Sequence, residues 1–282
     1  MGEQAWRLAV SNDLPVVGAA MTVSDLVANR DWLIARQRDL ELQDFVEPSL
    51  LEGDWRDRVA AARALLDGYA GRLGIHGPFW NLPLGAQDPL IRDAVRRRLW
   101  QGLDVCEALG ATHMVVHSPF TTWDYNNLDK DPGARDRLIE MCHWSMGDAV
   151  RRAESIGVTL VIENIEDKDP SARVALARAF NSPSVAVSVD TGHAHYAHGS
   201  TGAPPVDYYL LAAGDLLAHV HLQDADGYAD RHWVPGEGTI RWASVFAAIR
   251  QVATAPRLIL ELRDCARIQQ AAGWLAAQGL VE

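Results

Sequence analysis

The sequence predicts an α/β protein that folds as one (β/α)8 TIM barrel, a single domain covering residues 1–282. Continuous apolar runs of strand length alternate about eight times with segments long enough for a crossover helix, which is typical of parallel strands buried on both faces. Several of these runs end on a side chain that can bind a metal or transfer a proton. The length of 282 residues also suits one barrel, for which ~250 residues is typical.

The first half of the chain contains four expected strands, each followed by a helix. The helix after the third strand has the clearest bounds, because Asp88 and Pro89 form a start signal and Gly110 a stop signal. The expected strands are 7–11, 40–46, 72–76 and 112–117, and the expected helices are 24–38, 55–70, 88–109 and 133–156.

The second half repeats this order. Gly157 and Gly214 each end a helix just before a strand. The expected strands are 158–163, 184–190, 216–222 and 257–262, and the expected helices are 170–179, 206–213, 241–250 and 264–278. An open doubly wound sheet would show the same alternation, but no GxGxxG follows the first strand and polar residues follow strands three to eight, which favours closure around one centre.

Composition and charge narrow the range of functions that the protein could have. With 26 Lys+Arg against 37 Asp+Glu the formal charge is −11, which argues against binding a nucleic-acid backbone. The apolar stretches are too short for a membrane span and the N-terminus lacks a signal-peptide pattern, so we expect a cytoplasmic protein with no membrane partner. The three cysteines lie far apart without CxxC spacing, which fits a reducing compartment and excludes a thiolate zinc cluster.

Four strand-end residues form the predicted metal site. Parallel strands bring their carboxyl ends to one face of a barrel, where catalysis takes place in this fold. Burying a carboxylate there is costly unless it is paired or ligated. Oxygen and imidazole donors without thiolate suit Mn²⁺, Mg²⁺, Co²⁺ or Zn²⁺. The predicted ligands are Glu163, Asp190, His221 and Glu261.

Each of the four also has an ordinary structural interpretation. Asp190 could cap a helix, Glu261 could form a salt bridge, and His221 could be a hydrogen-bonded core histidine. Because four such side chains stand at four strand ends, one shared site is favoured over four unrelated structural roles.

A second set surrounds these four. The residues expected to bind substrate or a second metal are His76, His117, His193, Asp230 and His232. The side chains expected to line the substrate pocket are Trp80, Phe120, Trp233 and Arg263, because aromatic faces cover the C–H faces of sugars and a guanidinium binds anions.

The chain resembles the xylose isomerase-like barrel superfamily, which joins sugar and sugar phosphate isomerases and epimerases with the AP endonuclease family 2 and type-four AP endonucleases. The resemblance covers most of the chain and rests on the strings GIHGPF (74–79), VVHSPF (115–120), IENIED (162–167), VDTGHAH (189–195), HVHLQD (219–224), DRHWVPGEGTI (230–240) and LILELR (258–263).

In the isomerase and epimerase branch, the resemblance implies that Glu163, Asp190, His221 and Glu261 bind one divalent metal and that His193 touches a small sugar, keto-polyol or keto-acid substrate. It also implies that Glu163 and Glu261 are the catalytic acid and base of a proton transfer through a metal-stabilised enediolate.

In the endonuclease branch, the resemblance implies that three zinc ions are bound by the four predicted ligands together with the second set, His76, His117, His193, Asp230 and His232. It also implies cleavage of a phosphodiester at an abasic site. A third interpretation is a non-catalytic barrel that binds a polyol. The sequence leaves open the exact substrate, its phosphorylation, the identity and number of metals, and whether the protein is a homo-oligomer.

Overall fold

The computed structural model describes residues 14–282, and these residues form a closed barrel of eight parallel strands in sequential order. This confirms the predicted (β/α)8 fold. The strands are β1 (Gly18–Met21), β2 (Leu40–Leu42), β3 (Leu73–His76), β4 (His113–His117), β5 (Thr159–Glu163), β6 (Val185–Asp190), β7 (Leu217–Leu222) and β8 (Arg257–Leu260).

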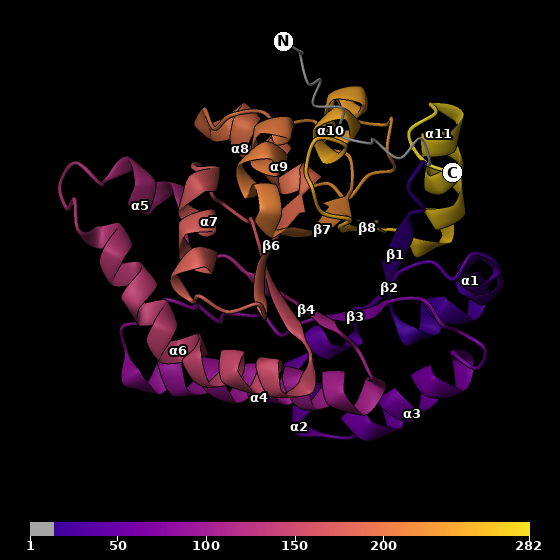
Figure 1. Cartoon of the computed structure of the whole chain (residues 1–282), viewed down its shortest axis with the longest axis horizontal. Coiled ribbons are helices and arrows are strands. Elements are labelled where there is room, and N and C mark those ends of the chain that lie inside the picture. Colours follow the sequence, from indigo (N-terminus) through magenta and orange to yellow (C-terminus); the bar gives the residue numbers. More distant parts are fainter. Residues whose placement is uncertain (1–13) are drawn as a thin grey trace, which may run out of the picture.

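The helices surround the barrel (Figure 1). The longest two, α4 and α6, pack side by side along one edge. The α-helices are α1 (Val23–Ala35), α2 (Pro48–Glu52), α3 (Trp55–Leu65), α4 (Pro89–Leu109), α5 (Thr122–Asn126), α6 (Ala134–Ile156), α7 (Pro170–Ala179), α8 (Thr191–Thr201), α9 (Val206–Ala213), α10 (Trp242–Ile249) and α11 (Ile268–Ala277). Short 3-10 turns are η1 (Asp44–Val46), η2 (Gly214–Leu216) and η3 (Cys265–Arg267).

Most expected elements agree with these bounds to within a few residues, and the first strand is the main exception. The predicted strand 7–11 lies outside the described residues, and the strand that closes the barrel between β2 and β8 is β1. Its short sequence GAAM contains none of the β-branched or aromatic residues that signal a strand. Three further helices, α2, α5 and α8, were not predicted.

Helix boundaries follow local chemistry. The Asp88 side chain accepts a hydrogen bond from the Leu90 amide at the start of α4, and Pro89 follows at the first helical position. Gly110 ends α4 with φ 72°, a left-handed conformation that glycine adopts without steric cost. These are the signals from which the helix was predicted.

Alternate strand residues face different layers. Leu160 and Ile162 of β5 belong to the large apolar core between strands and helices, whereas Val161 packs in a small separate cluster with Val115 and Ala186. Side chains alternate along a strand, so Val161 and Glu163 both face the barrel interior. The same alternation therefore gives the strands an apolar outer face and leaves the strand-end polar groups inside the barrel.

A bulge between β6 and β7 adjusts this alternation. Val187 pairs with Leu217 and Ser188 pairs with His219, which leaves Ala218 without a partner on β6. Such a bulge re-aims the following side chains. His219 then lies beside the Ser188 side chain in the barrel interior. Within residues 14–282, none of the helices combines the length and apolar character that a membrane span requires.

Candidate metal centre

Four predicted ligands meet at the carboxyl ends of β5 to β8. Strand register brings them there, because Asp190 pairs directly with His221 and Glu261 follows β8. His221 Nδ1 lies 2.6 Å from Glu163 Oε1, 3.3 Å from Glu261 Oε2 and 3.9 Å from Asp190 Oδ2. One ligand atom from each of the four lies within 4.8 Å of the others, and all four residues are buried.

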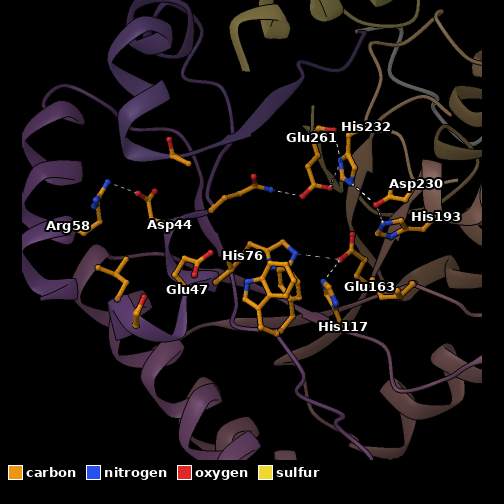
Figure 2. Close-up of a pocket in the computed structure, with 18 of the residues that line it drawn as sticks. Asp44, Glu47, Arg58, His76, His117, Glu163, His193, Asp230, His232 and Glu261 are labelled. Carbon is orange, nitrogen blue, oxygen red and sulfur yellow. Dashed lines mark hydrogen bonds and ion pairs between the residues drawn. The ribbon is translucent and has the colours of Figure 1, made fainter. Parts of the chain in front are cut away.

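Glu163 also belongs to a second group, on β3 to β5. Its Oε2 lies 3.7 Å from His76 Nε2 and 3.5 Å from His117 Nε2, distances too long for hydrogen bonds. Among the described residues, this buried oxygen has no hydrogen-bond partner. Figure 2 shows His76 to the left of the Glu163 carboxylate and His117 below it, with their ring nitrogens turned toward that carboxylate.

The third group consists of His193, Asp230 and His232. Asp230 Oδ2 lies 3.5 Å from His193 Nε2 and 3.1 Å from His232 Nε2. In Figure 2 these three side chains lie next to Glu261, on the opposite side of Glu163 from His76. The structure thus brings every residue of the predicted second set into a group with metal-ligand spacing.

Backbone carbonyl groups fix the ring orientation of three histidines. His76 donates Nδ1–H to the Gly77 carbonyl at 2.9 Å, His193 to that of Asn164 at 2.9 Å, and His232 to that of Glu261 at 3.1 Å. Each bond leaves Nε2 facing a carboxylate of the site. Metal-binding histidines usually have this arrangement, in which one nitrogen donates to a fixed acceptor and the other keeps its lone pair for the metal.

Asp190 has two roles at once. Its Oδ1 accepts a hydrogen bond from the His193 amide at 2.7 Å and thereby caps α8. Its other oxygen faces His221. The helix-cap interpretation of Asp190 and the ligand interpretation are therefore both compatible with the geometry.

Burial and mutual charge shift the pKa values of these groups in opposite directions. Burial, reinforced by the charges of Glu163 and Glu261, raises the pKa of Asp190 to about 6, although nearby His193 opposes this. Burial alone would depress the pKa of His232, but the Asp230 carboxylate raises it to about 9. Burial lowers the pKa of His117 to about 3. In the absence of a cation, protons on the imidazoles partly balance the carboxylates.

The donor set fits a divalent cation. Glu163 contributes a buried oxygen without a hydrogen bond, the histidines present oriented lone pairs, and all donors are oxygen or imidazole nitrogen. Such donors suit Mn²⁺, Mg²⁺, Co²⁺ and Zn²⁺ and do not distinguish among them.

Several residues near the site were not predicted from the sequence. The Gln223 side chain donates to Asp190 Oδ1 at 3.2 Å and to Asp230 Oδ1 at 2.8 Å, which links two ligand groups. Glu41 of β2 lies 3.0 Å from His221 Nε2. Glu41 stands between two leucines in a strand, and a polar residue at such a position is a signal that points into the barrel.

A cavity of about 1050 Å³ opens over the three groups. His76, His117, Glu163, His193, Asp230, His232 and Glu261 line its inner part, and Trp80 lies on its wall. Its outer part is formed by the residues after β2, among them Asp44, Glu47, Asp54 and Arg58. Figure 2 shows Asp44 and Arg58 paired at the far end of the pocket from Glu261.

The other predicted pocket residues lie elsewhere. Phe120 is buried and lines a separate cavity of about 680 Å³ next to α6. Trp233 and Arg263 are not among the residues that line the cavity over the site. The Trp233 backbone forms a bridge with Asp224, and the Arg263 amide donates to the His232 carbonyl, so these two residues help to hold the loop that carries His232.

Comparison with known proteins relates this chain to one family. The model of a family described as "xylose isomerase-like TIM barrel" matches residues 42–278. Fructoselysine 3-epimerase of Escherichia coli O157:H7 is 34% identical over 110 residues, which are 36% of this chain and 35% of that protein. The chain spans between 35% and 63% of the length of the curated relatives it matches.

Solved structures share the whole fold. The TTHB071 protein from Thermus thermophilus, soaked with ZnCl2, is 28% identical with a TM-score of 0.68, covering 93% of this chain and 98% of that one. A D-tagatose 3-epimerase-like protein is 17% identical with a TM-score of 0.69, covering 94% of this chain and 99% of that one. The second likeness concerns the fold alone.

Proposed function

Because this chain belongs to the xylose isomerase-like TIM barrel family, we propose that it is a divalent-metal-dependent isomerase or epimerase of a small sugar, keto-polyol or keto-acid. The observation that carries the proposal is the convergence of two buried glutamates, Glu163 and Glu261, on His221 at the floor of a large cavity. The similarity to fructoselysine 3-epimerase supports this class of reaction.

The two glutamates are the proposed acid and base. A divalent cation held by Glu163, Asp190, His221 and Glu261 would polarise a substrate carbonyl and the hydroxyl next to it. Glu163 comes from β5 and Glu261 follows β8, so their carboxylates approach the site from different strands. One removes the proton from the carbon beside the carbonyl, and the other supplies a proton to the resulting enediolate.

The destination of the proton decides the product. Protonation of the enediolate at the neighbouring carbon, with one hydroxyl proton passing between the two oxygens, gives an isomer, and protonation of the original carbon on its opposite face gives an epimer. The indole of Trp80, about half exposed on the cavity wall, offers an apolar surface for the C–H face of a sugar. The three unpaired cysteines suit a reducing compartment, and we propose that the enzyme works in the cytoplasm on a small-molecule substrate.

The test is exchange of substrate hydrogen with solvent. The metal-loaded protein is incubated in D2O with a panel of ketoses, inosose-like ketones and hydroxypyruvate-like acids, and deuterium incorporation is measured by mass spectrometry. For a substrate that the wild type exchanges, Glu261→Gln should lower the exchange rate by about 10²-fold or more, because the amide cannot act as a base or acid.

Two controls make this result specific. Glu237→Gln changes an exposed glutamate that pairs with Arg267 and should leave the exchange rate unchanged. Elemental analysis and circular dichroism should show that Glu261→Gln keeps its metal and its fold. Exchange at the wild-type rate in metal-loaded Glu261→Gln would contradict the assigned role.

A second candidate is a zinc phosphodiesterase of the AP endonuclease type. The observation that favours it is the presence of three adjoining groups of candidate ligands: Glu163 with Asp190, His221 and Glu261; His76 and His117 with the same Glu163; and His193 with Asp230 and His232. Three adjacent cations could together bind a phosphate group.

Charge argues against this candidate. Beyond the ligand groups, the cavity is lined by Asp44, Glu47 and Asp54, and its Arg58 pairs with Asp44 at 2.9 Å. Outside the metal groups, a polyanionic DNA strand would meet these carboxylates, and the lining residues offer no unpaired Lys or Arg to neutralise its phosphates. A neutral polyhydroxyl substrate could hydrogen-bond to the same oxygens.

Metal stoichiometry separates the two candidates. The isomerase or epimerase proposal predicts about one tightly bound equivalent of divalent metal per chain, measured by elemental analysis after dialysis. Three tightly bound zinc ions, together with incision of abasic duplex DNA, would establish the second candidate in its place. Protein that binds no divalent cation would favour a non-catalytic polyol-binding barrel.

A further inference from the structure

The hydrogen-bond acceptor behind His221 is a side chain, whereas the acceptors behind three of the other candidate ligand histidines are backbone carbonyl groups. His76, His193 and His232 each donate their rear N–H to a backbone carbonyl. His221 instead directs Nε2 at the Glu41 carboxylate, with Oε1 3.0 Å away. Its Nδ1 faces the opposite way, toward Glu163 and Glu261.

Glu41 is not placed to contact a substrate in the cavity. It lies in the middle of β2, is 2% exposed, and does not line the cavity over the site. Burying an ionised carboxylate is unfavourable unless its oxygens are paired. Its second oxygen, Oε2, lies 3.0 Å from His219 Nε2, in an arrangement too bent for a good hydrogen bond. His221 is therefore its well-aligned partner.

His219 completes a chain that leads away from the site. His219 Nδ1 is 2.8 Å from the Ser188 hydroxyl, and a hydroxyl can either donate or accept a hydrogen bond. The ring of His219 also stands edge-on to that of His221, with centroids 4.6 Å apart. The imidazole of His221 is thus held from behind by Glu41 and from the side by His219.

We propose that Glu41 is a positioning residue that holds the Nε2–H of His221, so that Nδ1 presents its lone pair to a metal shared with Glu163, Asp190 and Glu261. The inference rests on the proposed metal site. Carboxylates that orient a ligand histidine in this way raise metal affinity, and their loss typically costs about 10- to 100-fold.

The experiment measures metal affinity directly. Co²⁺ is titrated into the metal-free full-length protein, and binding is followed by visible absorption and by competition with a chelator. Glu41→Ala should weaken binding of the first Co²⁺ by about 10- to 100-fold and change its absorption spectrum, because the His221 ring loses its fixed orientation.

Two conservative variants separate orientation from charge. In Glu41→Gln the amide oxygen can still accept the Nε2–H of His221, and its NH2 can face His219, whose other nitrogen can then donate to Ser188. Glu41→Asp keeps the charge but shortens the side chain by one methylene. Positioning predicts affinity near the wild type for Glu41→Gln and a clear loss for Glu41→Asp, and the reverse order would overturn it.

A matched control lies on the same segment. Asp39 is also buried just before β2, but it pairs with Arg72 and not with a ligand histidine. Asp39→Asn should leave Co²⁺ affinity and spectrum unchanged, whatever it does to stability. If Glu41→Ala fails to fold, the comparison of Glu41→Gln with Glu41→Asp still decides the question.

The outcomes distinguish this inference from the proposed function. Wild-type protein that binds no Co²⁺ would remove the metal site and the proposed reaction with it. Wild-type protein that binds Co²⁺ together with Glu41→Ala that binds it equally well, with the same spectrum, would overturn the role of Glu41 and leave the proposed reaction standing.

Discussion

At the scale of single residues, the site combines groups that would be unfavourable alone. A buried glutamate such as Glu163 is stabilised by the imidazoles around it, and the charge of His221 and the bonds to it hold the pKa of Glu163 well below its usual range despite burial. The carboxylates of Glu261, Glu41 and Glu163 raise the pKa of His221 despite its burial. Those of Asp190 and Asp230 do the same for His193. In the metal-free protein, protonated imidazoles therefore contribute to stability.

This balance predicts a pH dependence of stability at His232. Its pKa is raised to about 9 in the folded protein, against about 6.5 when unfolded. The contribution is present in full below pH ~6.5 and is lost as the pH rises through about 9. A shift of this size corresponds to about 3 kcal/mol of folding free energy.

Urea unfolding of the metal-free protein at pH 6 and pH 9 checks this expectation. His232→Asn is a suitable variant because His232 has φ 51°, a left-handed conformation that asparagine tolerates. The variant should lose clearly less stability between the two pH values than the wild type. Equal losses in both proteins would show that His232 titrates normally.

At the scale of elements, the turn from β6 into α8 holds two groups of candidate ligands close to each other. Asp190 ends β6 and caps α8, and His193 follows in the first turn. Gly192 lies between them because a Cβ there would stand 2.2 Å from Cδ of the Gln223 side chain. Gln223 is fully buried and bonded to both Asp190 and Asp230.

Gly192→Ala should therefore affect both stability and metal binding. Inserting a methyl group into a packed position typically costs about 1–3 kcal/mol, and the displaced amide should also move Asp230 and weaken metal binding. The free energy of urea unfolding and a Co²⁺ titration measure the two effects.

The control is Gly273→Ala in α11. A Cβ at Gly273 would meet nothing within 4 Å, so alanine should stabilise this helix by about 0.5–1 kcal/mol. If Gly192→Ala were as stable as the wild type and bound metal equally well, the packing of Gln223 against α8 would not be needed to hold the ligands.

At the scale of the whole molecule, closure of the barrel decides which strand ends meet. β1 pairs with both β2 and β8, which completes the ring. Closure places Glu41 of β2 beside His221 of β7, although they are 180 residues apart in the chain. It also sets the residues after β2 across the cavity from His232 and Glu261 (Figure 2).

Much of the fold could be read from the chain because its signals are local. Continuous apolar runs mark buried parallel strands, and residues such as Asp88 and Gly110 mark helix ends. The strand-end residues Glu163, Asp190, His221 and Glu261 were predicted together because parallel strands share one carboxyl end. β1 and α8 were missed because neither GAAM nor the glycine- and histidine-rich stretch after Asp190 has a strong local pattern.

The sequence by itself determined the barrel, which candidate ligands stand at the strand ends, and the absence of thiolate from that set. Only the tertiary structure decided that these residues gather in overlapping groups that share Glu163 and His221, that Glu41 stands behind His221, and that Phe120 lies in another cavity. The physical reason is that periodicity and helix caps are properties of neighbouring residues, whereas ligand grouping and hydrogen-bond partners depend on strand register and barrel closure.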